Sequence, residues 1–287
     1  MTIPSIQRLS GVHGAIALAS ERTGIDFNYL LGQAQVESGL RTDARAGTSS
    51  ATGLYQFIEQ SWLGVVKQHG AEHGLGWAAD SIKQTAGGRY VVGDPALRSQ
   101  ILGLRSNATA ASLMAAEHAS DNKAALEARL DRPATGTDLY MAHFLGLGGA
   151  KKFLSAMDAN SGRSAASLFP AAARANHNVF YANDGSPRSL GEVYQRFAAK
   201  LDKGAAAGGG TGLASDALDP SGNGTAIGAD PDVEVVLGTE AQGGDRQWLA
   251  STLAQINAAK PTSAAALLRP NPENARLAYL MLARLGG

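Results

Sequence analysis

The sequence predicts a mainly α-helical protein, and three observations support this prediction. Apolar residues recur at helical spacing through most of the first 200 residues. Aromatic residues make up only 6% of the chain while 35 of its 287 residues are glycine, which suggests helices packed through small side chains and interrupted by loops. Only residues 85–95, rich in Gly, Val and Tyr, favour a short hairpin or an ordered loop.

The predicted helices share a periodic apolar face, and most have a capping or helix-breaking residue nearby. They are expected at 4–20, 26–38, 58–73, 106–130, 137–145, 149–158 and 188–202. The first segment also has a weak likeness to a signal peptide. His13 and two glycines interrupt its apolar stretch, however, so an ordinary first helix is the favoured interpretation.

Composition divides the chain into three parts. Residues 1–203 are expected to form one compact helical domain. Residues 204–245 are rich in Gly, Ala and Asp and are expected to form a flexible linker. Residues 246–287 contain two amphipathic segments around a Pro/Ser turn, which predicts a small C-terminal helical hairpin.

Charge and residue usage exclude several classes of function. The 25 basic and 25 acidic residues balance, so there is no basic surplus of the kind that binds nucleic acid. The absence of cysteine excludes disulfides, thiolate metal sites and cysteine nucleophiles. No apolar run reaches the roughly 18 residues of a membrane span. We expect no cofactor, no metal and no membrane span.

One glutamate has the position of a general acid. Asp26 is a plausible N-cap for a helix that ends near Gly39. Glu37 then lies in the last turn, on the shoulder of the apolar face. Partial burial and the negative end of the helix dipole both disfavour an ionised carboxylate there. A glutamate at a helix end is more often a solvated surface residue, so the position alone does not establish catalysis.

The residues that follow strengthen the case for an enzyme. A small polar run, 48–52, leads to Gly53-Leu54-Tyr55-Gln56 and then to a new helix. A glycine permits close approach of a ligand, and Tyr55 and Gln56 supply a flat face and an amide suited to a sugar.

Glu37-Ser38 followed by Gly53-Leu54-Tyr55-Gln56 resembles the E-S…G-L-M-Q signature of the soluble lytic transglycosylase catalytic domain, with Tyr55 where methionine is common. The resemblance covers about residues 20–180. It implies a lysozyme-like helical fold and cleavage of the β-1,4 bond between N-acetylmuramic acid and N-acetylglucosamine in peptidoglycan. Ser38 then either bonds locally at the helix end or orients Glu37 and the sugar, and the resemblance favours the second role.

A second family motif, A-Y-N-x-G, is altered here to Ala142-His143-Phe144-Leu145-Gly146. Because the asparagine is missing, Tyr140 or His143 are expected to supply the polar contacts near the acid. Glu117 is either a carboxylate lining the cleft or a partly buried glutamate paired with a neighbour. The candidate site thus consists of catalytic Glu37 and the substrate-binding residues Ser38, Tyr55, Gln56, Glu117, Tyr140 and His143.

The resemblance also implies a mechanism with one carboxyl group. Glu37 protonates the glycosidic oxygen and then, as a base, takes a proton from the muramyl C6 hydroxyl, which attacks the anomeric carbon. The product is a 1,6-anhydromuramyl end, formed without water. A retaining or inverting hydrolase would instead need two carboxylates.

Two alternatives remain open. His69-Gly70-Ala71-Glu72-His73 matches the letters of the H-x-x-E-H zinc-peptidase motif, although no third ligand can be identified from the sequence. The other alternative is a non-catalytic lysozyme-like module that binds glycan strands or assembles with a partner through the C-terminal hairpin.

The expected substrate, peptidoglycan, lies outside the cytoplasmic membrane. Without a convincing secretory signal, the expected routes to the periplasm or cell wall are a flagellar or type III export apparatus, or delivery by a phage. The C-terminal hairpin is the candidate contact with such an apparatus.

Overall fold

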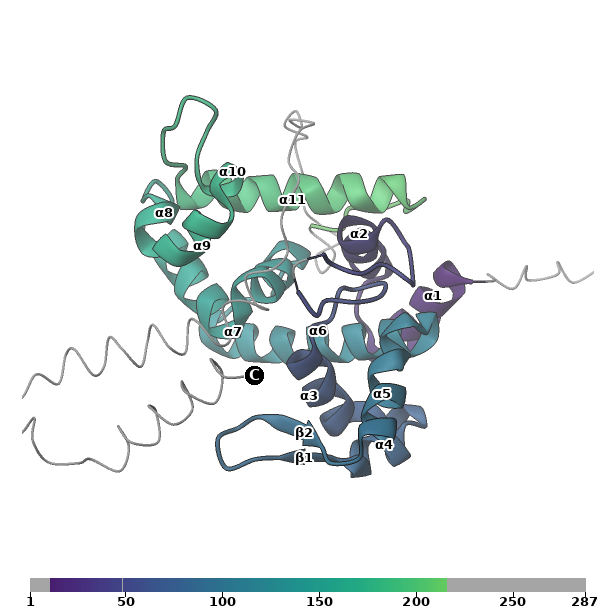
Figure 1. Ribbon diagram of the computed structural model, residues 1–287. Helices are drawn as coiled ribbons and strands as arrows, with labels where there is room; N and C mark the ends of the chain where they lie inside the picture. The colour runs from purple at the N-terminus through teal and green to yellow at the C-terminus, as the bar shows by residue number, and fades with distance from the viewer. Residues whose placement is uncertain (1–10, 48, 216–287) are drawn as a thin grey trace, which may run out of the picture. The chain divides into compact units, whose positions relative to one another are not determined.

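The computed structural model describes residues 11–47 and 49–215, which form a mainly helical body (Figure 1). The prediction of an all-α class is confirmed at this level. The chain separates into two units, Met1–Gln242 and Gly243–Gly287, and the second lies outside the described residues, as does the predicted hairpin at 246–287.

The first two helices end close to where local signals predict. α1 spans Val12–Thr23, so it runs past the expected end at residue 20, and residues 4–10 lie outside the described part. α2 spans Phe27–Ser38, as expected. The Asp26 carboxylate accepts from the Tyr29 N–H at 2.9 Å, and Gly39 ends the helix with φ 60°. The predicted cap and stop are therefore confirmed.

A smaller group of elements follows α2. It comprises α3 (Glu59–His69), the 3-10 helix η1 (Gly70–His73), α4 (Gly76–Ser81), strands β1 (Ile82–Gln84) and β2 (Tyr90–Val92), α5 (Pro95–Gly103) and η2 (Leu104–Ser106). The hairpin is antiparallel and pairs Ile82 with Val92, so its first strand begins before the expected residue 85. α4 and α5 were not predicted, although Asp94 caps α5 by accepting from the Ala96 N–H at 2.7 Å.

Two long helices frame the body. α6 (Ala108–Leu130) matches the expected segment and is capped by Asn107. α11 (Leu190–Ala207) begins with a capping box formed by Ser189 and Glu192. α2 and α7 (Gly136–Ala159) each contact both long helices and lie between them (Figure 1). This arrangement brings the end of α2, which carries Glu37, against α7 and α11.

α7 differs from its prediction because two expected helices, 137–145 and 149–158, form one element. Its axis is broken at Gly146, where φ is 71° and ψ is 159°. Only glycine adopts that conformation at low cost, which explains why the break falls at a glycine. Gly146 is also the last residue of the altered motif. Three short helices that were not predicted follow: α8 (Ala165–Leu168), α9 (Pro170–Ala175) and α10 (His177–Phe180).

The described chain stays packed on the body beyond residue 203, where the compact domain was expected to end. α11 continues to Ala207, and the chain packs on the body as far as Ser215. Ala214 is fully buried, and the Ser215 carbonyl accepts from the Thr137 N–H at 3.0 Å. The glycine-rich composition predicted a linker because glycine makes a free chain flexible. Glycine also lets segments of backbone pack closely, and residues up to Ser215 pack in this way. Residues 216–245 lie outside the described part.

Candidate active site

The Glu37 side chain is completely buried at the C-terminal turn of α2. His143 on α7 lies within ion-pair distance of it, with Nε2 3.3 Å from Oε1 of Glu37. Within the described residues, neither carboxylate oxygen has a partner with hydrogen-bond geometry. The groups that surround the carboxyl group are the His143 ring, 3.3 Å away, and the Tyr140 hydroxyl, which interacts with Glu37.

Tyr140 and His143 lie on one face of α7 and stack with ring centroids 5.9 Å apart. Burial raises the pKa of the Tyr140 hydroxyl well above its usual value, and the charge of nearby Glu37 raises it further. The pKa of Tyr29 on α2 is raised for the same two reasons, first by burial and then by the charge of Glu37. Both phenols therefore stay protonated and can serve only as neutral hydroxyls near the carboxyl group.

Lys200 on α11, which was not predicted as a site residue, also feels the charge of Glu37. Burial lowers the pKa of Lys200 from 10.5 to about 8, and the charge of Glu37 opposes this shift. A signal was available, because Lys200 follows Phe197 by three residues and precedes Leu201 on the apolar face of the helix. Lys200 is partly buried in the structure, and burial of a charged ammonium group carries a free-energy cost.

The helices α2, which carries Glu37, and α11, which carries Lys200, pack closely through glycines. A Cβ atom at Gly32 would lie 2.7 Å from the Leu201 carbonyl oxygen, and one at Gly204 would lie 2.8 Å from that of Gly32. Any side chain at either position would separate the helices. The two glycines thus set the distance between the helix that carries the acid and the helix that carries the cation.

Ser38 connects the acid-bearing helix to the G-L-Y-Q segment. Its hydroxyl lies 2.9 Å from the Leu54 carbonyl oxygen and 3.0 Å from that of Ala34, with donor geometry to both. The hydroxyl is therefore occupied by backbone groups, which corresponds to the local-bonding interpretation and gives Ser38 a positioning role.

The fold requires glycine at position 53, because the backbone of Arg105 occupies the space that a side chain would need. Its φ is 84°, and a Cβ atom would lie 1.9 Å from the Arg105 carbonyl oxygen. Arg105 in turn donates to the carbonyl oxygens of Ser50 and Phe57 at 2.7 and 3.0 Å. Sequence reasoning assigned the close approach to a ligand, whereas the backbone of η2 makes it.

Tyr55 and Gln56 also make internal contacts. The Tyr55 ring belongs to the core and is 1% exposed, so it presents no open flat face to a sugar. Gln56 has φ 47°, and its Nε2 donates to the carbonyl oxygens of Gly53 and Ala44 at 2.8 and 3.2 Å. These two residues hold the loop that Ser38 joins to α2.

Glu117 belongs to a different cluster. It lies on α6 with Oε1 2.6 Å from Nε2 of His73, and Oε2 is 3.6 Å from Nδ1 of His69. The structure therefore pairs it with histidines, as one of the two sequence interpretations expected. Of the predicted site residues, Tyr140 and His143 are the two for which a direct interaction with Glu37 is found.

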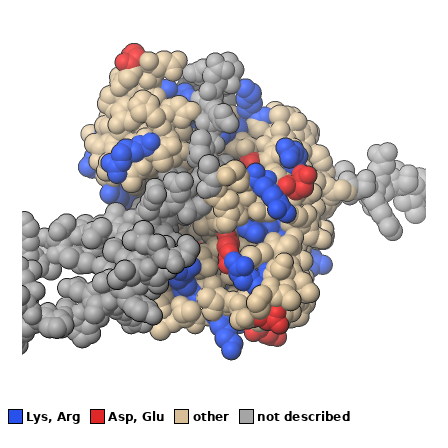
Figure 2. Space-filling model, in the orientation of Figure 1, with Lys and Arg blue, Asp and Glu red and all other residues tan. Residues whose placement is uncertain are grey.

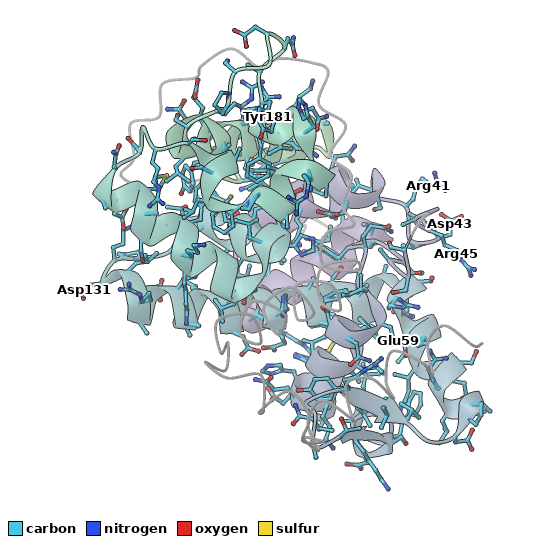
Figure 3. All side chains as sticks on the ribbon, turned by 60° about the vertical axis from the view of Figure 1, so that its left-hand side comes forward. Arg41, Asp43, Arg45, Glu59, Asp131 and Tyr181 are labelled. Carbon is cyan, nitrogen blue, oxygen red and sulfur yellow. The ribbon has the colours of Figure 1, made fainter. Side chains whose placement is uncertain are left out.

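The connection after α2 carries exposed charges of both signs. Arg41 and Asp43 are 3.5 Å apart, and their side chains are 68% and 81% exposed. Figure 3 shows both residues and Arg45 projecting from the edge of the body. On the face shown in Figure 2, Lys and Arg side chains are spread over the surface rather than collected in one stripe.

Comparison with known protein families gives no assignment, because no family model matches the sequence. Among the described residues, none of the helices has the length and apolar character needed to cross a membrane.

Proposed function

We propose that this protein is a peptidoglycan lytic transglycosylase in which Glu37 is the single acid and base. The observation that carries the proposal is the Glu37 side chain, fully buried at the end of α2 beside His143 and Tyr140. The sequence motif that contains it supports the same activity. The Ser38 bond to Leu54 supports the pairing of the two parts of that motif.

In this mechanism Glu37 first donates its proton to the glycosidic oxygen, which leaves with the N-acetylglucosamine side of the bond. The ionised Glu37 then accepts the proton of the muramyl C6 hydroxyl as that oxygen bonds to the anomeric carbon. The bond formed and the bond broken both involve C1 of the muramyl residue, and the proton returns to Glu37. No water is consumed, and one carboxyl group is sufficient because the nucleophile belongs to the substrate.

Lys200 and His143 complement the ionised state of Glu37 in this proposal. The carboxylate that forms after the first proton transfer is buried, and a buried charge requires compensation. Burial lowers the pKa of Lys200 to about 8, so at pH 7 most molecules still carry the proton on this side chain. Nε2 of His143 lies 3.3 Å from Oε1 of Glu37, close enough to interact with the carboxylate.

Substrate must reach a carboxyl group that its neighbours now cover. The His143 side chain is 15% exposed, whereas that of Glu37 has no exposed surface. His143 is thus a partly exposed neighbour of the carboxyl group, and the proposal requires that its ring move away from Glu37 when a glycan strand binds.

Replacement of Glu37 tests the proposal directly. Glu37→Gln is expected to keep the fold and to lower the release of anhydromuropeptides from purified sacculi by at least about 10²-fold, because it removes the transferable proton. Mass spectrometry of the digest identifies the chemistry, and Glu21→Gln, an exposed substitution in α1, is the control. Anhydromuropeptides released by the Gln variant at the wild-type rate would remove Glu37 from this role. Reducing-end muropeptides from wild type would indicate hydrolysis, and cleaved peptides a peptidase.

A non-catalytic glycan-binding module is the second candidate, and the Phe144 side chain favours it. Phe144 stands where the family motif has asparagine, is 2% exposed, and packs against Phe197 at a centroid distance of 4.8 Å. An apolar core residue cannot hold an acetamido group. Wild-type protein that sediments with intact sacculi and releases nothing would support this second candidate.

The proposed substrate places the site of action in the periplasm or cell wall. Export through a flagellar or type III apparatus, or delivery by a phage, remains the proposed route. A partner in that apparatus is part of the same proposal.

A further inference from the structure

A second cluster of ionisable side chains joins the end of α3 to the middle of α6. His69 is the last residue of α3, and Glu72 and His73 lie in η1. Glu117 and Asp121 lie one turn apart on α6. We call these five residues the His–carboxylate cluster. It brings the H-x-x-E-H segment together with two carboxylates that the sequence alone could not associate with it.

Three ligand atoms of the cluster converge at distances that suit a metal ion. Nδ1 of His69 lies 3.4 Å from Oε1 of Glu72 and 3.6 Å from Oε2 of Glu117. One ligand atom from each of these residues lies within 4.8 Å of the others. In a tetrahedral zinc site with bonds of about 2.0–2.1 Å, ligand atoms are roughly 3.3–3.5 Å apart. The Glu72 side chain is 63% exposed, so rotation about its bonds can bring its oxygen closer to that of Glu117.

His69 is oriented as metal-binding histidines usually are. Its Nε2 lies 3.0 Å from Oδ2 of Asp121, and a proton on Nε2 is donated to that carboxylate. Nδ1 then carries a free lone pair, and within the described residues this buried atom has no hydrogen-bond partner. A carboxylate that accepts from the far nitrogen of a ligating imidazole is a usual outer partner in zinc sites.

Glu117 is held in place by the second histidine. Nε2 of His73, whose side chain is only 6% exposed, lies 2.6 Å from Oε1 of Glu117. The other oxygen of Glu117, Oε2, is the one that faces His69. Each inner ligand from α3 and α6 therefore has its own outer partner, Asp121 for His69 and His73 for Glu117.

This arrangement differs from that of a zinc peptidase. In the H-x-x-E-H motif both histidines bind the metal and the glutamate acts as the base. Here Nε2 of His73 is committed to Glu117. In a 3-10 helix residues three apart align, which places Glu72 rather than His73 opposite Nδ1 of His69. The chemistry of the three convergent atoms is one imidazole nitrogen and two carboxylate oxygens.

We propose that His69, Glu72 and Glu117 bind one Zn²⁺ ion, which fastens the end of α3 and η1 to α6. Imidazole and carboxylate are ligands that zinc accepts, and three protein ligands leave the fourth position to water. Asp121 and His73 are positioning residues for this site. The carboxyl groups of Glu72, Glu117 and Asp121 surround the His69 ring, and oxygen ligands of this kind favour a cation.

The test uses the full chain, stripped with EDTA and dialysed, and titrated with ZnCl₂ at pH 7.5 by isothermal calorimetry. We expect one site per chain, an increase in Tm of several degrees with zinc, and visible absorption typical of four-coordinate Co²⁺ when cobalt is used instead. Glu72→Gln removes an exposed ligand without disturbing the core and should weaken zinc binding at least 10-fold. Asp121→Asn should weaken it about 10- to 100-fold with the stoichiometry unchanged, as found for outer partners of ligating histidines.

The control is Glu21→Gln, which lies outside the cluster and should bind zinc as wild type does. Equal zinc affinity in wild type, Glu72→Gln and the control would overturn the proposal, since it would place the binding elsewhere. The absence of any heat or Tm change would overturn it as well and would identify the cluster as an ion-pair network. Both measurements are independent of the activity of Glu37.

Discussion

The buried carboxyl group of Glu37 takes its chemical character from residues on three helices. Its own helix, α2, places it near a negative dipole end, α7 supplies Tyr140 and His143, and α11 supplies Lys200. Local sequence predicts the first contribution only. This environment lowers the pKa of Lys200 from 10.5 to about 8, close to neutral pH. Replacing Lys200 therefore gives a clear test at the level of single residues.

Lys200→Met is expected to stabilise the protein while lowering activity. Below pH 8 Lys200 is charged in both the folded and the unfolded chain, so the full cost of burying its charge is present. Because the pKa falls from 10.5 to about 8 on folding, this cost is about 3 kcal/mol. Between pH 8 and 10.5 the folded protein loses the proton first, and the stability of wild type rises toward that of the variant.

Urea unfolding of both proteins at pH 7 and pH 10 measures this difference. Lys203→Met, three residues further along α11, is the control. A stability gap that stays constant between the two pH values would show that Lys200 is not charged and buried as described.

Gly53 provides a second test at a single residue. Gly53→Ala is expected to destabilise the protein by about 3 kcal/mol or more, because the added methyl group meets the Arg105 carbonyl and φ is positive. Gly103→Ala, in open space at the end of α5, should change stability by less than about 1 kcal/mol. Chemical denaturation of the two variants compares them, and similar midpoints would contradict the packing assigned to Gly53.

The contact between α2 and α11 sets the geometry of the candidate site at the level of helices. Gly204→Ala places a methyl group 2.8 Å from the Gly32 carbonyl and 2.9 Å from Cγ2 of Val36. The helices must separate, at a cost of roughly 1–3 kcal/mol. Activity should fall with stability, because Lys200 moves away from Glu37.

Gly191→Ala is the matched substitution in the first turn of the same helix, where the nearest atom lies 3.5 Å away. It should be tolerated with wild-type activity. Thermal unfolding and muropeptide release measured on both variants separate the effect of helix packing from that of a changed glycine content. Equal behaviour of the two variants would contradict the role of the α2–α11 contact.

For the molecule as a whole, the body extends to Ser215 because Asp202 holds the chain after α11. Its Oδ1 accepts from the N–H groups of Ala214 and Ser215, each at 2.8 Å, and Oδ2 accepts from the Ser215 hydroxyl at 2.8 Å. The Ser215 carbonyl then accepts from the Thr137 N–H, so the segment bridges α11 and α7.

Asp202→Ala is therefore expected to lower the free energy of unfolding by about 1–3 kcal/mol, since three hydrogen bonds to a carboxylate are lost. Hydrogen exchange should accelerate at residues 211–215 and at the start of α7. Asp80→Ala, an exposed substitution in α4, serves as the comparison. Unchanged exchange at 211–215 would show that the segment is held by apolar contacts alone.

The sequence by itself determined the helical class, the bounds of α2, its Asp26 cap and Gly39 stop, and the place of Glu37 in the last turn. These follow from hydrophobic periodicity and capping, which depend on residues within one or two turns of each other. The hairpin and α6 were predicted for the same reason.

Only the tertiary structure decided which helix faces meet. It placed Lys200 near Glu37, joined Glu117 to His69 and His73, set Gly53 against Arg105, and kept residues up to Ser215 on the body. Each pair is far apart in the chain, and its contact depends on how helices cross and how closely small residues let them approach. Such distances are not encoded in local periodicity, so they could not be obtained from the order of residues.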